Sequence, residues 1–216
     1  MTAVAIFASG RGSNFEAIHA AVQSAQLDAE IRLVISDQPN APVLAKARER
    51  GLRAICVEPL QAGAQAQRRE EHESRILARL KEVSPRFLVM AGYMRILSPL
   101  LIEAFRSERG YARIVNVHPS LLPAFRGTGA YRQAFDYGAK LTGATIHLVE
   151  DEVDGGPICA QEAFSIADCR SAEDVERRGL AVEHRLFTET LKWVLPEAFT
   201  VEQRSPLSGR YCVRAS

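Results

Sequence analysis

The sequence contains few of the residue types that mark secreted, metal-binding or membrane-embedded proteins. It has four cysteines and one tryptophan in 216 residues. The thiols form no C-x-x-C pair and have no histidine at ligand spacing, which argues against zinc and thioredoxin-like sites; they are Cys56, Cys159, Cys169 and Cys212. We therefore expect reduced, structural cysteines and no bound metal.

The sequence also lacks an excess of charge and a long apolar run. Its 27 lysines and arginines face 26 aspartates and glutamates, a formal net charge of +1. Proteins that bind nucleic acid or anionic lipid by bulk electrostatics normally carry a clear basic excess, so we expect neither partner. No apolar run approaches the roughly 20 residues of a membrane span, and no basic segment precedes the first one. We expect a cytoplasmic protein that binds small anionic molecules locally.

Short apolar runs alternate with stretches of helical period, and this alternation is typical of an α/β protein. The runs are continuously apolar, as parallel strands covered on both faces require. We therefore predict a doubly wound, mostly parallel sheet with helices on both faces. The expected strands are residues 3–8, 31–36, 53–57, 87–91 and 113–116, and the expected helices are 13–24, 43–50, 65–82 and 99–107. Gly51 and Gly110 occupy expected helix C-caps.

The second half of the chain changes pattern. A loop of about a dozen residues, 118–129, precedes a helix at 130–137, strands at 142–148 and 158–164, and a helix from about 171 to 195. Ser171-x-x-Asp174 has the form of an N-terminal cap for that last helix. Without a linker rich in glycine, proline or serine, residues 1–200 are predicted to form a single catalytic domain. Residues 201–216 are predicted to form a C-terminal tail or short hairpin.

The first expected strand ends in Ser9-Gly10-Arg11-Gly12-Ser13-Asn14 and runs into a helix. Such a junction points free N–H groups and the positive helix end at an anion. The segment lacks both the Walker ending and the third glycine of a dinucleotide fingerprint, so a single phosphate fits better. The alternative is a tight turn capped by Ser13 or Asn14.

Asn116 and His118 follow a strand expected at the centre of the sheet, where open α/β sheets place their ligands. Because they are two residues apart, their side chains project to the same side of an extended chain. An amide donor and an imidazole suit a tetrahedral oxyanion. The alternative is a structural asparagine and a satisfied core histidine.

Asp154 begins Asp154-Gly155-Gly156-Pro157, where glycines allow a tight backbone. A carboxylate here is placed to reach the histidine; pairing favours the imidazolium, whereas burial opposes it. The alternative is simple turn chemistry. Sequence separation does not decide between a contact and a turn.

Taken together, these segments resemble the phosphoribosylglycinamide formyltransferases of the folate-dependent formyltransferase family. The resemblance covers residues 3 to about 196 in order. It includes GSN at 12–14, AGYMRIL at 91–97, NVHPSLLP at 116–123, GATIH at 143–147, DEVDGGP at 151–157, and Glu183-His184. No single segment is specific, but their ordered combination is.

The resemblance implies a Rossmann-like formyltransferase fold and a reaction of purine (IMP) biosynthesis. The amine of phosphoribosylglycinamide would attack the formyl carbon of 10-formyltetrahydrofolate, a cosubstrate, through a tetrahedral intermediate and without a metal. Asn116 and His118 would stabilise the oxyanion, His118 would donate the proton, and Asp154 would keep the imidazole charged. The protein would act as a monomer or homodimer.

The resemblance also assigns two binding regions. The ribonucleotide region would comprise Gly12, Ser13, Asn14, Leu180, Ala181, Val182 and Glu183. The folate region would comprise Arg69, Met94, Arg95, Ile96, Leu97, Asn116, Glu150, Asp151, Glu152, Val153 and Asp154. Arg69 lies in a charged stretch where a solvated helix face is as good an interpretation.

The sequence departs from the family pattern after Pro123. Only Arg126 remains of a stretch that is often basic or aromatic, so the phosphate would depend more on backbone N–H groups. Gly129 and Tyr131 stand where some members place histidines, which puts side-chain roles at these positions in doubt. We expect this loop to order when substrate binds.

Two other functions compete with formyl transfer. Formyltetrahydrofolate deformylase, a hydrolase, uses the same asparagine, histidine and aspartate with water in place of the amine. It usually has an extra N-terminal domain, which we do not expect because a strand is predicted from Ala3. A noncatalytic folate or nucleotide sensor would keep the pocket without turnover. A methionyl-tRNA formyltransferase is disfavoured by the length and by the +1 charge.

Overall fold

The structure is a computed structural model that describes residues 1–60, 64–203 and 211–215. The chain divides into two compact units, Met1–Val115 and Asn116–Ser216. Each unit is described by itself, and the prediction of a single domain over residues 1–200 stays a prediction. Residues 204–210 and 216 of the predicted tail lie outside the described residues.

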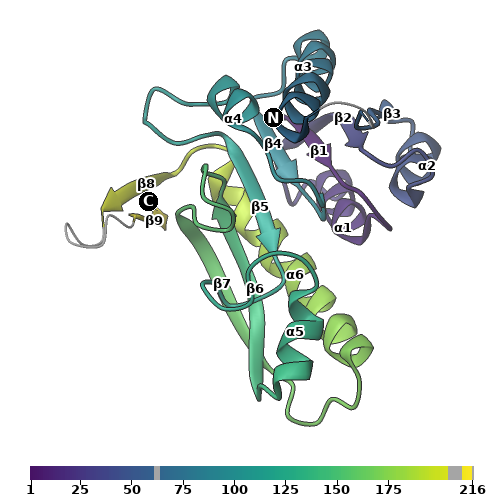
Figure 1. Cartoon of the computed structure of the whole chain (residues 1–216). Coiled ribbons are helices and arrows are strands. Elements are labelled where there is room, and N and C mark those ends of the chain that lie inside the picture. Colours follow the sequence, from purple (N-terminus) through teal and green to yellow (C-terminus); the bar gives the residue numbers. More distant parts are fainter. Residues whose placement is uncertain (61–63, 204–210, 216) are drawn as a thin grey trace. The chain divides into compact units, whose positions relative to one another are not determined.

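The first unit contains a parallel sheet in the order β3-β2-β1-β4. Its strands are β1 (Thr2–Phe7), β2 (Ala29–Ser36), β3 (Ala54–Cys56) and β4 (Phe87–Met90). The helices are α1 (Ser13–Gln23), α2 (Pro42–Glu49), α3 (Gln65–Val83) and α4 (Pro99–Ala104). Figure 1 shows α1 and α2 on one face of these strands and α3 on the other. The strand order reverses between β3 and β4, which requires crossovers on opposite faces.

The strands of this unit form because their side chains are buried on both faces. Every residue of β4 is buried, and so are the last four residues of β1. Burying one such aliphatic or aromatic side chain stabilises the fold by about 1.5–3 kcal/mol. The predicted α/β fold with a mostly parallel sheet and helices is therefore confirmed.

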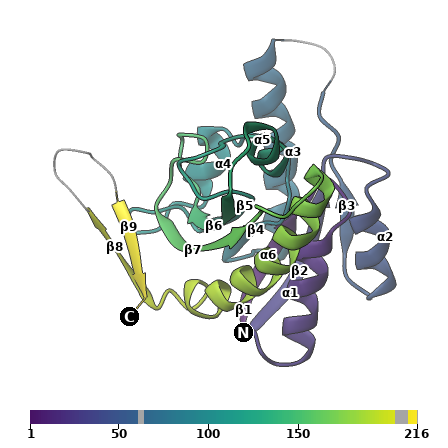
Figure 2. The same cartoon turned by 90° about the horizontal axis from the view of Figure 1, so that it is seen from below.

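The second unit combines a long hairpin with two helices. Strand β5 (Ile114–His118) leads into it, and β6 (Leu141–Leu148) pairs antiparallel with β7 (Ile158–Ser165). Helix α5 (Ala130–Tyr137) packs on α6 (Ala172–Val194), and α6 covers β6 and β7, as Figure 2 shows. At the C-terminal end, β8 (Phe199–Gln203) pairs antiparallel with β9 (Tyr211–Ala215), which touches β7 at Ile158 and Cys212.

Local signals placed most helix ends correctly. The Ser171 hydroxyl accepts a hydrogen bond from the Asp174 N–H (3.1 Å), so the predicted cap of α6 is confirmed. Gly51 has φ +73 just after α2, as a C-terminal glycine should. The prediction at Gly110 is wrong, because α4 ends at Ala104 and Gly110 instead closes a turn on the Ser107 carbonyl.

Candidate functional site

His118 ends β5 and has both ring nitrogens engaged. Its side chain is almost fully buried, with the whole residue 4% exposed. Nε2 lies 2.9 Å from the Phe125 carbonyl oxygen, and Nδ1 lies 3.5 Å from Asp154 Oδ2. A carbonyl only accepts hydrogen bonds, so Nε2 carries a proton, while Nδ1 faces the carboxylate. The ring therefore has a proton on Nε2 to donate.

Asp154 reaches the histidine because of an unusual turn after β6. The aspartate has φ +52, and the Gly155 N–H donates to the Glu152 carbonyl (2.9 Å). A Cβ on Gly156 would lie 1.9 Å from the Leu148 carbonyl oxygen, so that position has to be glycine. Asp154 Oδ2 also accepts a hydrogen bond from the Gly127 N–H (2.8 Å). The contact that sequence separation left open is thus present in the structure.

Asn116 is oriented by His147 on β6, a residue to which the sequence motifs assign no role. The Asn116 amide nitrogen lies 3.1 Å from His147 Nε2, and His147 Nδ1 lies 2.9 Å from the Leu148 carbonyl oxygen. Burial lowers the pKa of His147 below its usual value and keeps the ring neutral. Nδ1 therefore carries the proton, and Nε2 accepts from Asn116. A lone histidine in an otherwise buried apolar strand was the one signal that could have found it.

The loop between β5 and α5 is attached to the hairpin by side chains of β6 and β7. Thr145 Oγ1 donates to the Ser120 carbonyl (2.6 Å) and accepts from the Leu122 N–H (3.1 Å). Gln161 Nε2 donates to the Leu122 carbonyl (3.0 Å). These bonds fix the first part of the loop, three residues before Phe125, whose carbonyl contacts His118.

The other candidate residues of the second unit lie on α6 and on the acidic turn. Glu183 faces inward and accepts a hydrogen bond from the Tyr131 hydroxyl (2.7 Å), whereas residues 180–182 are half-buried or exposed. Within the turn, Glu152 pairs with Arg126 (2.6 Å), and Val153 is 41% exposed. Glu150 is half-buried and Asp151 is exposed. Arg126 therefore already has an acidic partner in this structure.

In the first unit, Gly12 is the N-cap of α1. It has φ +77, and a Cβ there would lie 2.6 Å from Val43 Cγ2, so glycine is required by both backbone and space. The N-cap residue is a glycine and so offers no side chain to cap this helix end. The first turn therefore presents backbone N–H groups, the feature that suits a phosphate.

The segment 94–97 follows β4, the strand that pairs with β1. Ser9 Oγ accepts a hydrogen bond from the Met94 N–H (2.9 Å) and donates to buried Asp37. Arg95 lies 3.9 Å from the same carboxylate. This network joins the segments that follow β1 and β4 at one edge of the sheet.

The side chains of this segment differ in exposure. Met94 and Ile96 are 63% and 50% exposed, whereas Leu97 is buried. Ser98, the next residue, is held by buried Glu73 of α3, which accepts a hydrogen bond from the Ser98 N–H (2.8 Å). Arg69 is half-buried one turn before Glu73 on α3. Hydrogen bonds at Met94 and Ser98 thus hold this segment in place, with the apolar side chains of Met94 and Ile96 exposed to solvent.

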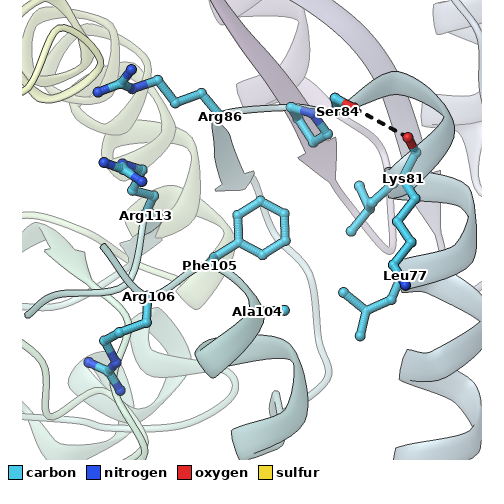
Figure 3. Close-up of a pocket in the computed structure, with 10 residues that line it drawn as sticks. Leu77, Lys81, Ser84, Arg86, Ala104, Phe105, Arg106 and Arg113 are labelled. Atoms are coloured by element: carbon cyan, nitrogen blue, oxygen red, sulfur yellow. Dashed lines mark hydrogen bonds between the residues drawn. The ribbon is translucent and has the colours of Figure 1, made fainter. Parts of the chain in front are cut away.

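A cavity of about 310 Å³ lies elsewhere in the first unit, between α3 and α4 (Figure 3). None of its lining residues is a candidate site residue, and its Arg106 is paired with Glu103 (2.6 Å). Among the described residues, no group of three or more His, Cys, Asp or Glu side chains could hold a metal ion. In the same part of the chain, no helix is long and apolar enough to cross a membrane.

Comparison with known proteins identifies the family. Residues 2–191 match the model of the Formyl transferase family. A phosphoribosylglycinamide formyltransferase of Bacillus subtilis (strain 168) is 35% identical over 90% of this chain and 95% of its own length.

Solved structures give a consistent result. Glycinamide ribonucleotide transformylase 1 from Symbiobacterium toebii superposes with a TM-score of 0.88 at 32% identity, covering 100% of this chain and 94% of that one. A formyltetrahydrofolate deformylase from Pseudomonas syringae pv. tomato str. DC3000 has a TM-score of 0.84 at 24% identity, covering 99% of this chain and 65% of that one. At that identity it shows a shared fold only.

Proposed function

The chain belongs to the formyl transferase family, and we propose that it transfers the formyl group of 10-formyltetrahydrofolate to the amine of phosphoribosylglycinamide, a step of purine biosynthesis. The enzyme is a one-carbon transferase. The observation that carries the chemistry is the cluster of Asn116, His118 and Asp154, with His118 Nδ1 3.5 Å from Asp154 Oδ2.

The reaction follows from the polarity of this cluster. The substrate amine forms a bond to the formyl carbon, and the carbonyl oxygen becomes an oxyanion that the Asn116 amide and the His118 imidazolium stabilise. When the carbon–N10 bond breaks, the leaving nitrogen takes a proton and the amine loses one. His118 supplies the proton to the leaving nitrogen, and Asp154 helps to relay the proton lost by the amine back to the imidazole through water, so the transfer balances.

His118 must exchange one partner to act. Its Nε2 proton points to the Phe125 carbonyl (2.9 Å), so a substrate oxygen or nitrogen has to replace that carbonyl as acceptor. Phe125 has φ +50 and lies in the loop that we expect to order when substrate binds. Movement of this residue would therefore release the proton donor.

The two binding regions are proposed on local chemistry. The N-terminus of α1 at Gly12, Ser13 and Asn14 would take the phosphate, and Glu183 on α6 would accept from the ribose. Backbone groups of Arg95 to Leu97 would read the pterin edge, with Ile96 as an exposed apolar contact. Arg69 and Arg95 would meet the folate carboxylates.

The function is tested by following 10-formyltetrahydrofolate with and without phosphoribosylglycinamide. We expect tetrahydrofolate to appear only with the amine, in step with formylated product detected by mass spectrometry. Equal loss of the formyl group in both samples would indicate a deformylase, and tight binding without turnover would indicate a sensor. His118→Ala should abolish most of the turnover, whereas His19→Ala, a half-exposed histidine of α1, should retain it.

A further inference from the structure

Tyr131 and Glu183 form a buried pair between α5 and α6. The tyrosine is 6% exposed, the glutamate 5%, and the Tyr131 hydroxyl donates a 2.7 Å hydrogen bond to Glu183 Oε1. The tyrosine ring packs with Ala134, Val175 and Ile166, and its centroid lies 6.1 Å from that of Phe164. The ring is thus held on several sides while its hydroxyl reaches one carboxylate oxygen.

Gly179 makes this contact possible. It lies one helical turn before Glu183 on the same face of α6. A Cβ at this position would lie 2.2 Å from Cζ and 2.3 Å from the hydroxyl oxygen of Tyr131. Because the ring is enclosed, it has little room to yield, and any larger residue at position 179 would push the hydroxyl away from Glu183. Tyr131, Gly179 and Glu183 therefore depend on one another.

We propose that Tyr131 is a positioning residue that fixes the Glu183 carboxylate for the hydroxyl groups of the substrate ribose, in the space left by Gly179. This inference rests on the proposed function, which places the ribose at Glu183. It also gives a role to the tyrosine that stands where some members of the family place a histidine.

The chemistry of the pair suits a sugar diol. A carboxylate has two oxygens and about four acceptor positions, so it can accept from a phenol and from a sugar hydroxyl together. Unlike lysine or arginine, a phenol adds no charge beside the carboxylate, and burial raises the pKa of Tyr131, so the hydroxyl remains a donor. A carboxylate held in one orientation suits the hydroxyl groups of a ribose.

The first test compares Tyr131→Phe with Tyr137→Phe, which removes the hydroxyl of an 82% exposed tyrosine on the same helix. Tyr131→Phe should raise KM for phosphoribosylglycinamide roughly tenfold, with kcat and KM for 10-formyltetrahydrofolate within about twofold of wild type. Tyr137→Phe should match wild type. An unchanged ribonucleotide KM in Tyr131→Phe, or equal losses for both substrates, would overturn the proposal.

The second test asks whether Tyr131 acts through Glu183. In the Glu183→Ala background, Tyr131→Phe should cause no further change in KM, because the carboxylate it orients is gone. Gly179→Ala should reproduce the effect of Tyr131→Phe on KM, since the added Cβ would displace the Tyr131 hydroxyl from Glu183. If the effects of Glu183→Ala and Tyr131→Phe on KM were additive, the two residues would have separate structural roles and the proposal would be contradicted.

The third test separates this inference from the proposed function. Calorimetric titration of phosphoribosylglycinamide and of its deoxyribose analogues needs no turnover. Tyr131→Phe should weaken binding of the ribose compound roughly tenfold and leave the analogue lacking the contacted hydroxyl within about twofold. Equal weakening of all compounds would overturn the role of Tyr131. Absence of formyl transfer by wild type would instead overturn the proposed function.

Discussion

Replacing His147 by phenylalanine tests whether the buried imidazole behind Asn116 holds that amide in its working orientation. The substitution keeps a ring of similar size but removes the acceptor that lies 3.1 Å from the Asn116 amide nitrogen. It also removes the donor to the Leu148 carbonyl. Neither bond is proposed to touch substrate, so the effect should fall on the transition state, in which we propose that Asn116 donates to the oxyanion.

The magnitude follows from the lost hydrogen bond and the freed amide. A buried hydrogen bond contributes about 0.5–1.5 kcal/mol net, and an unpaired buried group costs about 1–3 kcal/mol. Removing an oxyanion donor outright costs about 100- to 1,000-fold in kcat. A misoriented but present amide should cost less, so we expect kcat to fall roughly 10- to 100-fold. KM for both substrates should change less than about threefold.

The assay is steady-state formyl transfer, with urea unfolding to show that the variant is folded. Thr142→Val is a matched control on β6, because the buried Thr142 hydroxyl has no hydrogen-bond partner among the described residues. It should retain wild-type kcat. In an Asn116→Ala background, His147→Phe should add little, since the group it positions is absent. A wild-type kcat in His147→Phe, or full additivity with Asn116→Ala, would refute the reasoning.

Three further predictions concern the turn of α1, the acidic turn and the response to pH. Gly12→Ala forces a side chain into a left-handed conformation and against Val43, so the free energy of unfolding of the first unit should fall by about 2 kcal/mol, seen as a lower urea midpoint. An unchanged midpoint would contradict the close packing. Asp154→Asn should lower kcat about 100-fold and alter the pH–rate profile, because His118 Nδ1 loses the carboxylate that faces it; an unchanged profile measured by stopped-flow would refute the pairing. Burial lowers the pKa of His147 from 6.5, so its neutral form contributes stability that is present above pH 6.5 and is lost as the pH falls toward the lowered pKa. In that interval, the free energy of unfolding of wild type should fall by up to about 1.4 kcal/mol more than that of His147→Phe for each unit by which the pH is lowered, as measured by urea unfolding at several pH values.

The parts of the fold set by local chemistry were predictable from the sequence. The apolar runs of β1 and β4 have no polar residues on either face, so each of these strands has to be covered on both sides. Alternation along β5 placed Asn116 and His118 on one side of the chain without knowledge of any partner. These inferences need only the geometry of an extended chain.

The remaining features depend on how distant segments pack. No local pattern aligns His147 with Asn116, 31 residues away, or joins Tyr131 to Glu183, 52 residues away, since each contact is set by how its strand or helix packs. The error at Gly110 has a related origin: after α4 ends at Ala104, the Phe105 carbonyl accepts a hydrogen bond from the Arg113 N–H (2.8 Å) instead of one from a continuing helix. Hydrogen bonds to residues outside an element thus override its local signals.

The Leu148 carbonyl oxygen, at the end of β6, contacts two parts of the candidate site. On one side it receives the His147 ring, which supports Asn116; on the other, the backbone of Gly156 approaches so closely that no side chain fits. The Asn116 amide, through His147, and the turn that carries Asp154 therefore both depend on the position of a single oxygen atom. Lengthening the turn by one residue would disturb both supports at once, so the exposed position of Asp151 should tolerate a change of side chain, whereas the turn should not tolerate a change of length.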